Sequence, residues 1–87
     1  MITEFAKLVG VLEEDILGIS RIPRVVEARQ MYHFILKQAG FSFSEIGRLC
    51  GVNHATVIHS IKKVEMMLEI KDKIFTTMYE QVKSIKR

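Results

Sequence analysis

The sequence has few of the residues that mark secreted, disulfide-bonded or membrane proteins. Cys50 is the one cysteine among 87 residues, so no intrachain disulfide can form and a reducing compartment is favoured. No uninterrupted apolar run approaches the roughly 18 residues that a membrane span needs. The N-terminus also lacks the basic start and the apolar stretch of a signal peptide. We therefore expect a cytoplasmic protein without a membrane segment.

Proline and glycine are also scarce, and their positions divide the chain into helices. Pro23 is the one proline, and the five glycines all lie at or before Gly51. Between and after these breakers, apolar residues recur at helical spacings of three and four. Because 48% of the residues are apolar, the chain should fold around a core. The pattern predicts an all-α domain with five or six helices.

Three helices are expected in the first half of the chain, over residues 3–9, 13–17 and 25–39. The third should be a central core helix, because Met31, Phe34 and Ile35 belong to a wide apolar stripe. A loop over 19–24 should precede it and carry two arginines around the proline.

A helix-turn-helix pattern occupies residues 42–68. Ser42 and Glu45 match the S-x-x-E capping box that begins a helix. Gly51 supplies a turn, and Asn53 is a good N-cap for the second helix. The residues expected to face inward are Ile46, Leu49, Cys50, Val57, Ile61, Val64 and Leu68.

The second helix of this pattern presents polar and cationic groups outside its apolar seam. In a helix-turn-helix, the first residues of that helix reach base edges in the major groove, and later residues contact phosphates. The expected base readers are Asn53, His54, Ala55 and Thr56. The expected phosphate contacts are His59, Lys62 and Lys63. The alternative interpretation is that this is the solvated face of an ordinary helix.

A second basic cluster comprises Arg21, Arg24 and Arg29. A flexible arginine arm can enter a minor groove, where negative potential is focused. Scattered solubilising arginines are the alternative, and Glu27 among them argues against a strong phosphate-binding surface.

The charge of the chain is concentrated where the helix-turn-helix pattern lies. Residues 21–63 hold seven basic and two acidic residues, a net charge of +5. Residues 1–20 hold one base and four acids, a net charge of −3, and residues 64–87 carry +1. A basic segment of this kind favours a polyanionic partner.

Catalysis and metal binding are not expected. The residues that could support either are His33, Cys50, His54 and His59. His54 and His59 are five residues apart, so they do not stack on one helix face as zinc ligands four residues apart do. No G-x-x-x-x-G-K-[ST] phosphate-binding loop occurs. We expect a protein that is not an enzyme and uses no metal, cofactor or nucleotide.

The C-terminal segment leaves two interpretations open. Apolar residues from Ile70 to Ile85 predict a further amphipathic helix. Its apolar face could pack on the domain's own core. It could instead be a partner surface, formed by residues 66–87, for a homodimer or for another protein.

Three ordered motifs carry a resemblance to a known family. They are Ala28-Arg-Gln-Met-Tyr, Ser44-Glu-Ile-Gly and Asn53-His-Ala-Thr-Val-Ile-His-Ser-Ile-Lys-Lys-Val-Glu. Together they resemble the C-terminal DNA-binding domain of the bacterial replication initiator DnaA. The resemblance implies a Trp-repressor-like, all-helical domain over 1–68, with 69–87 as a helical extension of the same domain.

The resemblance also implies binding of the DnaA box in double-stranded DNA. By position, the family's major-groove readers fall on Asn53, His54, Ala55 and Thr56, its phosphate contacts on His59 and Lys63, and its core-helix contacts on Arg29 and Gln30.

The sequence departs from the family pattern at several of these positions. Asn53 replaces an aspartate, Ala55 replaces a threonine, and the turn is one residue shorter. Pro23 aligns with the arginine of the family's basic loop, and Glu27 occupies a commonly basic position. Losing one base contact typically costs ~1–3 kcal/mol of discrimination, so the two changes at Asn53 and Ala55 predict either a retargeted or a blurred specificity.

The expected function is sequence-specific binding of double-stranded DNA in the control of replication initiation or of transcription. The alternative is a protein-interaction module that kept the fold, binds an initiator protein or dimerises through residues 66–87, and binds DNA weakly. Family members also carry an ATPase domain, for which this sequence has no counterpart. Both a standalone module and an excised domain fit the sequence.

Overall fold

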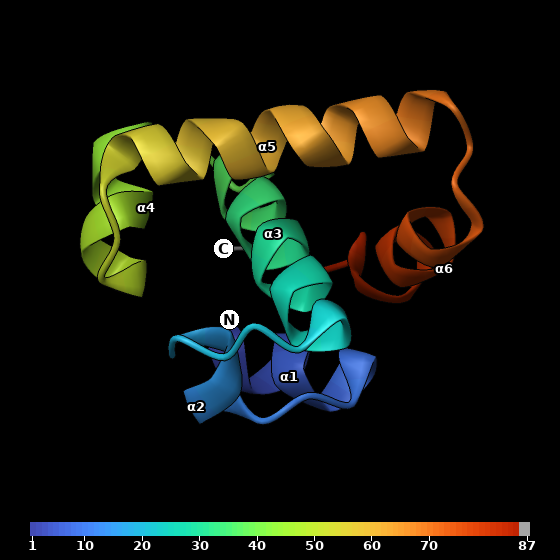
Figure 1. Cartoon of the computed structure of the whole chain (residues 1–87), viewed down its shortest axis with the longest axis horizontal. Coiled ribbons are helices and arrows are strands. Elements are labelled where there is room, and N and C mark those ends of the chain that lie inside the picture. Colours follow the sequence, from blue (N-terminus) through green and yellow to red (C-terminus); the bar gives the residue numbers. More distant parts are fainter. Residues whose placement is uncertain (86–87) are drawn as a thin grey trace.

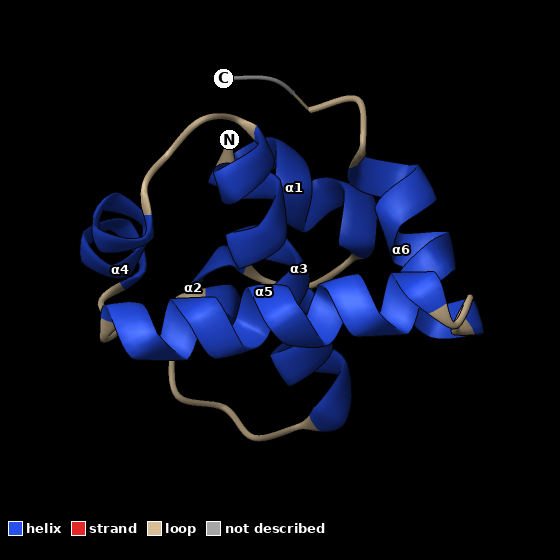
Figure 2. Cartoon of the chain, turned by 90° about the horizontal axis from the view of Figure 1, so that it is seen from above, coloured by secondary structure: helices blue, strands red, loops and turns tan. Residues whose placement is uncertain are grey.

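A computed structural model describes residues 1–85 and shows six helices, with no strand in that range (Figure 1). The helices are α1 (Ile2–Val9), α2 (Glu13–Ile16), α3 (Pro23–Gln38), α4 (Phe43–Cys50), α5 (His54–Glu69) and α6 (Lys73–Val82). The expected all-α class is confirmed. Seen from above, α5 crosses the molecule with the other helices beneath and beside it (Figure 2). Within the described residues, no helix has the length and apolar character needed to cross a membrane.

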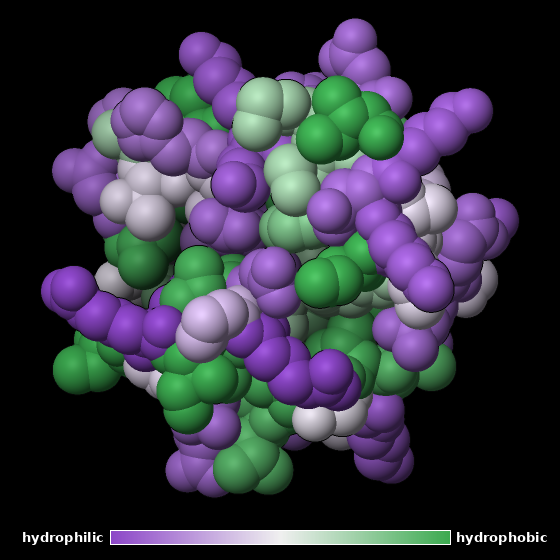
Figure 3. All heavy atoms as spheres, turned by 45° about the vertical axis from the view of Figure 1, so that its right-hand side comes forward, coloured by the Kyte–Doolittle hydropathy of each residue, from purple (hydrophilic) through white to green (hydrophobic). Residues whose placement is uncertain are grey.

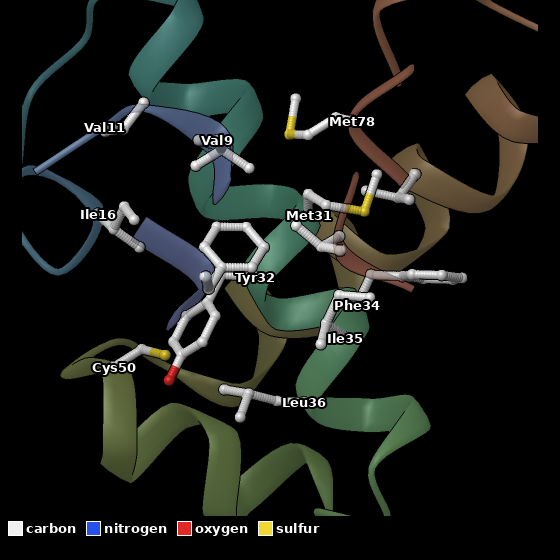
Figure 4. Packing of buried hydrophobic residues seen from close by; sticks show 14 of the residues in the cluster. Val9, Val11, Ile16, Met31, Tyr32, Phe34, Ile35, Leu36, Cys50 and Met78 are labelled. Atoms are coloured by element: carbon white, nitrogen blue, oxygen red, sulfur yellow. The ribbon is translucent and has the colours of Figure 1, made fainter. Parts of the chain in front are cut away.

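Helix α3 is the centre of the fold, as its apolar stripe predicted. It runs from α1 and α2 at one end of the molecule to α5 at the other (Figure 1). Six consecutive residues, 31–36, are buried, so the helix is covered on nearly every side. The ring of Tyr32 packs on Phe5 of α1 with centroids 5.0 Å apart, and its side chain extends toward Cys50 of α4 (Figure 4). Helix α3 therefore connects α1 and α2 with α4 and α5.

Helix α3 begins two residues earlier than expected. Pro23 occupies its first turn, where a missing backbone N–H has no helical partner to lose. The preceding loop therefore ends at Ile22, and Arg24 belongs to the helix.

The corner between α4 and α5 follows the local sequence signals. The Ser42 hydroxyl accepts from the Glu45 N–H at 3.1 Å, and the Glu45 carboxylate accepts from the Ser42 N–H at 2.8 Å. Gly51 ends α4 with a left-handed φ of 67°, which glycine adopts without steric cost. A Cβ at Gly47 would lie 2.7 Å from the carbonyl oxygen of Val52. Glycine is therefore needed where the chain turns back over α4.

The prediction that Leu49 faces inward was wrong, since its side chain is 54% exposed. The buried face of α4 consists of Ile46, Gly47 and Cys50. At about 100° per residue, Leu49 lies about 100° outside the centre of that face. The prediction that Leu49 lies in the core relied on its apolar character alone.

The C-terminal segment folds as a shorter helix than expected. Helix α5 ends at Glu69, Lys71 adopts a left-handed φ of 58°, and the Asp72 carboxylate accepts from the Phe75 N–H at 3.0 Å. The new helix α6 buries Phe75, Met78 and Val82 in the same core as α1 and α3. Ile70 and Ile74 stay exposed. Residues 86–87 of the predicted partner segment lie outside the described residues.

Candidate nucleic-acid interface

Helix α5 separates an apolar seam from a polar edge. Val57, Ile61 and Val64 are buried against the rest of the domain. All seven residues that the sequence singled out on this helix and its cap are exposed: Asn53, His54, Ala55, Thr56, His59, Lys62 and Lys63. These groups therefore lie at the exposed start of α5 and along its solvent-exposed side, and Figure 1 shows α5 at the outside of the molecule. That edge contains hydrogen-bonding groups at its start and cations further along.

Asn53 serves as the cap of α5 with one end of its amide. Its Oδ1 accepts from the Ala55 N–H at 2.7 Å, which fixes the side chain at the helix start. The amide nitrogen keeps two donors that face solvent beside His54. A group held by its own helix loses little side-chain entropy when it binds a partner.

Two further polar residues, Ser44 and Arg48, belong to this surface and were not predicted from the sequence. Both are exposed on α4, four residues apart and therefore on the same side of the helix. They line a shallow hollow of about 380 Å³ together with Gly47, Gly51, Val52, Asn53 and His54. The position of Arg48 in the last turn of α4, three residues before Gly51, is the signal that could have located it.

The arginines near α2 do not form a flexible arm. The guanidinium of Arg29 donates to three carbonyl oxygens, those of Asp15 at 2.8 Å, Ile16 at 2.9 Å and Ser20 at 3.1 Å. Arg24 donates to the carbonyl oxygen of Val9 at 2.9 Å. Arg29 therefore holds the end of α2 and the following loop on α3, and its geometry gives no support to the predicted DNA contact.

Arg21 and Gln30 complete the predicted set. Arg21 is exposed, and within residues 1–85 it forms no hydrogen bond or ion pair. Gln30 is half-buried on α3 beside Arg29. Of the basic cluster, Arg21 has the guanidinium that is free to bind a partner.

Comparison with known proteins agrees with this geometry. The family described as the bacterial dnaA protein helix-turn-helix matches residues 1–64, which include the whole of α1 to α4 and most of α5. The chain belongs to this family. Helix α6 lies beyond the matched residues.

Three curated relatives are each a chromosomal replication initiator protein DnaA. That of Kosmotoga olearia is 48% identical over 60 residues, which cover 68% of this chain and 13% of that protein. That of Bacteroides thetaiotaomicron is 40% identical over 68 residues, covering 76% and 14%. That of Rhodopseudomonas palustris strain TIE-1 is 36% identical over 84 residues, covering 94% and 17%. The chain therefore matches less than a fifth of the length of these relatives.

The remaining candidates for chemistry in this DnaA-family domain are buried. Burial raises the pKa of the Cys50 thiol to about 11, so the thiol stays protonated at neutral pH. His33 is 1% exposed on α3, away from the polar edge of α5. Among the described residues, no group of three or more histidine, cysteine or acidic side chains could hold a metal ion.

Proposed function

We propose that this domain binds double-stranded DNA in a sequence-dependent way, with α5 in the major groove, and acts in the control of replication initiation or of transcription. The observation that carries the proposal is the accessible polar edge of α5, which starts with hydrogen-bonding groups and continues with cations. Membership of the DnaA helix-turn-helix family supports it, as do relatives that are replication initiators.

The proposed roles follow the position of each side chain along the helix. His54 and Thr56, with the free amide donors of Asn53, lie at the end that enters a groove and would contact base edges. His59, Lys62 and Lys63 lie further along and would contact phosphates. Ser44 and Arg48 would add a contact from α4, since they share a hollow with His54.

The proposal is tested by selection and titration. Duplexes bound by the whole chain are selected from a randomised library, and their affinity is measured by fluorescence anisotropy beside a DnaA-box duplex and a scrambled one. We expect affinity to fall steeply with salt, because each phosphate contact releases about 0.9 counterions. Weak, salt-independent binding to every duplex would disprove DNA binding.

Two substitutions separate reading of bases from anchoring on phosphates. Lys63→Ala should weaken binding to all duplexes alike and reduce the salt slope by about 1. His54→Ala should instead reduce the preference for the selected duplex, at a cost on the order of 1–3 kcal/mol. Glu69→Ala, at the far end of the same helix, is the control and should change neither quantity.

A second candidate function is association with another protein through the C-terminal segment. Met66, Ile70 and Ile74 are each more than half exposed near the junction of α5 and α6. Hydrophobic residues interrupt the hydrophilic surface on this side of the molecule (Figure 3). Light scattering tests self-association, and a pull-down with the initiator tests the other partner. A monomer that retains no initiator would rule out both.

A further inference from the structure

A cavity of about 450 Å³ lies between α1, α3 and α6. Its floor is apolar, since Val9, Val11, Ala28 and Met78 line it and each is at most 9% exposed. Val9, Val11 and Met78 lie at the same end of the core (Figure 4). Concave sites of about 300–1,000 Å³ with an apolar lining and a few polar groups are typical of small-molecule binding, and spaces between packed helices often supply them.

The cavity lies apart from the candidate nucleic-acid interface. None of the described residues that line it belongs to α4 or α5. In Figure 1 the first turns of α3 lie beside α1, whereas the start of α5 lies beside α4 at the other end of the molecule. A small molecule in the cavity would therefore leave the polar edge of α5 accessible.

Two cations stand at the rim of the cavity. They are Arg24, in the first turn of α3, and Lys73, the first residue of α6. Both side chains are exposed, and within residues 1–85 neither forms an ion pair. Nη2 of Arg24 donates to the Val9 carbonyl oxygen at 2.9 Å, which holds the guanidinium at the rim. An arginine that is already ordered, and that has further N–H donors, loses little entropy when it binds a ligand.

The charge of the rim favours a ligand with a single negative group. Glu27 is the one acid among the lining residues, so the two cations and this acid give a net charge of +1. A carboxylate fits a guanidinium because it can accept two parallel N–H bonds. Glu27 opposes a second negative charge, and no third cation among the described lining residues offsets it. The rim therefore favours a monocarboxylate over a polyanion.

The volume of the cavity limits the size of the apolar part. A water molecule takes about 30 Å³ in the liquid, so the cavity has room for roughly 15 atoms other than hydrogen. A membrane lipid with two long acyl chains does not fit this volume. Ile74 lines the cavity and is 56% exposed, so a ligand of the right size would also cover apolar surface that is now in water.

We propose that the cavity between α1, α3 and α6 binds a small monocarboxylate with an apolar aliphatic or aromatic body. The carboxylate lies between Arg24 and Lys73, and the body packs on Val9, Val11 and Met78. This inference goes beyond the proposed DNA binding and does not depend on it. Because the ligand contacts three helices together, its binding stabilises the packing of α6 on the domain.

The test uses octanoate as the probe, octan-1-ol as the same body without the charge, and acetate as the charge without the body. Amide shifts in NMR titrations of the ¹⁵N-labelled chain report both the site and the affinity. Octanoate should shift residues 9–11, 24–28 and 73–81, saturate with a dissociation constant on the order of 1 mM or lower, and raise the melting temperature. Octan-1-ol and acetate should each bind about tenfold more weakly or less.

Single substitutions at the rim test the role of charge. Lys73→Gln, at an exposed residue, should weaken octanoate binding about two- to fivefold and leave octan-1-ol binding unchanged. Glu27→Gln should strengthen octanoate binding by a similar factor, because a like charge is removed. Lys7→Gln is the matched control, since Lys7 is an exposed lysine of α1 that does not line the cavity, and it should change neither affinity.

A further variant tests the cavity itself. Thr77 is exposed on α6 at the cavity wall, so Thr77→Phe places a ring in the space that the ligand needs. Binding of octanoate should then be lost while circular dichroism shows the wild-type fold. A folded Thr77→Phe variant that binds octanoate as the wild type does would overturn the site.

The remaining outcomes separate the site, the ligand class and the proposed function. Octanoate that shifts none of the lining residues, or that lowers the melting temperature, would overturn the site. Octan-1-ol or acetate that binds as tightly as octanoate would overturn the ligand class. DNA titrations on the same samples are independent, because a chain that binds octanoate and selects no duplex would overturn the proposed function alone.

Discussion

At the scale of single residues, His33 is a polar group in an apolar place. It is 1% exposed, and neither ring nitrogen has a hydrogen-bond partner. Burial, with a smaller contribution from the nearby Arg29 cation, lowers the pKa of His33 from 6.5 to about 4. The imidazole is therefore neutral in the folded domain, and its protonation opposes folding.

This burial predicts a loss of stability in acid. A histidine with a lowered pKa in the folded state contributes fully above pH 6.5, and that contribution falls as the pH drops toward 4. We expect it to cost about 2 kcal/mol of unfolding free energy between pH 7.5 and 4.5. Urea unfolding of His33→Leu should lack this part of the pH dependence, whereas exposed His59→Leu should keep it. Equal pH dependence in all three proteins would contradict the prediction.

Arg29 gives a second prediction at this scale. A lysine ammonium is a point charge and cannot reach three carbonyl oxygens as the planar guanidinium does. Arg29→Lys should lower the unfolding free energy by about 1–3 kcal/mol, because carbonyls of the α2 end lose their donors. Arg21→Lys, on an exposed residue, should leave it unchanged. Urea denaturation of both variants measures the unfolding free energies. An Arg29→Lys variant as stable as the wild type would show that the three hydrogen bonds do not hold the loop.

At the scale of elements, the α4–α5 corner depends on close approach at Gly47. The atom nearest to an added Cβ is a backbone oxygen, which cannot move aside as a side-chain tip can. Gly47→Ala should therefore cost about 1–3 kcal/mol of unfolding free energy and weaken DNA binding by shifting the start of α5. Ser44→Ala, one turn earlier and exposed, should not affect stability. Thermal unfolding measures the effect on stability, and fluorescence anisotropy measures the effect on DNA affinity. A Gly47→Ala variant with wild-type stability and affinity would show that the corner can open freely.

The elements that the sequence predicted well are those with local signals. The capping box at Ser42, the turn at Gly51 and the seam from Val57 onward each depend on residues a few positions apart, and all three are present. The break between α5 and α6 has one local signal, the Asp72 cap, but the left-handed Lys71 before it is a conformation that lysine rarely adopts, so spacing did not predict the break. The inward position of Arg29 depends likewise on where α2 lies in space.

The same distinction applies to the candidate interface. The polar edge of α5 follows from helical period alone, so its exposed residues could be predicted. Arg48 joins that edge only because α4 ends beside the start of α5, and Ile19 and Ile22 in the loop before α3 are exposed only because nothing in the fold covers them. Whether these residues are exposed, and what they lie beside, depends on their tertiary position, which spacing in the sequence does not encode.

At the scale of the whole molecule, α6, the last helix along the chain, completes the core. Phe75 is 1% exposed and Val82 is fully buried, in one cluster with Phe5 of α1 and Met31 of α3. Segments at the two ends of the chain therefore share one core. This arrangement predicts that the domain unfolds as one unit, although the family match ends before α6.

Phe75→Ala tests whether α6 is part of that unit. Truncating a buried phenylalanine costs about 3–5 kcal/mol, a large share of the roughly 4–13 kcal/mol expected for a domain of this length. Urea unfolding of the variant should remain a single transition at a much lower midpoint. Ile74→Ala, on the exposed neighbour, should cost less than about 1 kcal/mol. If Phe75→Ala cost no more than Ile74→Ala, α6 would be an appendage, and its exposed Ile74 would lie on a segment free to leave the domain.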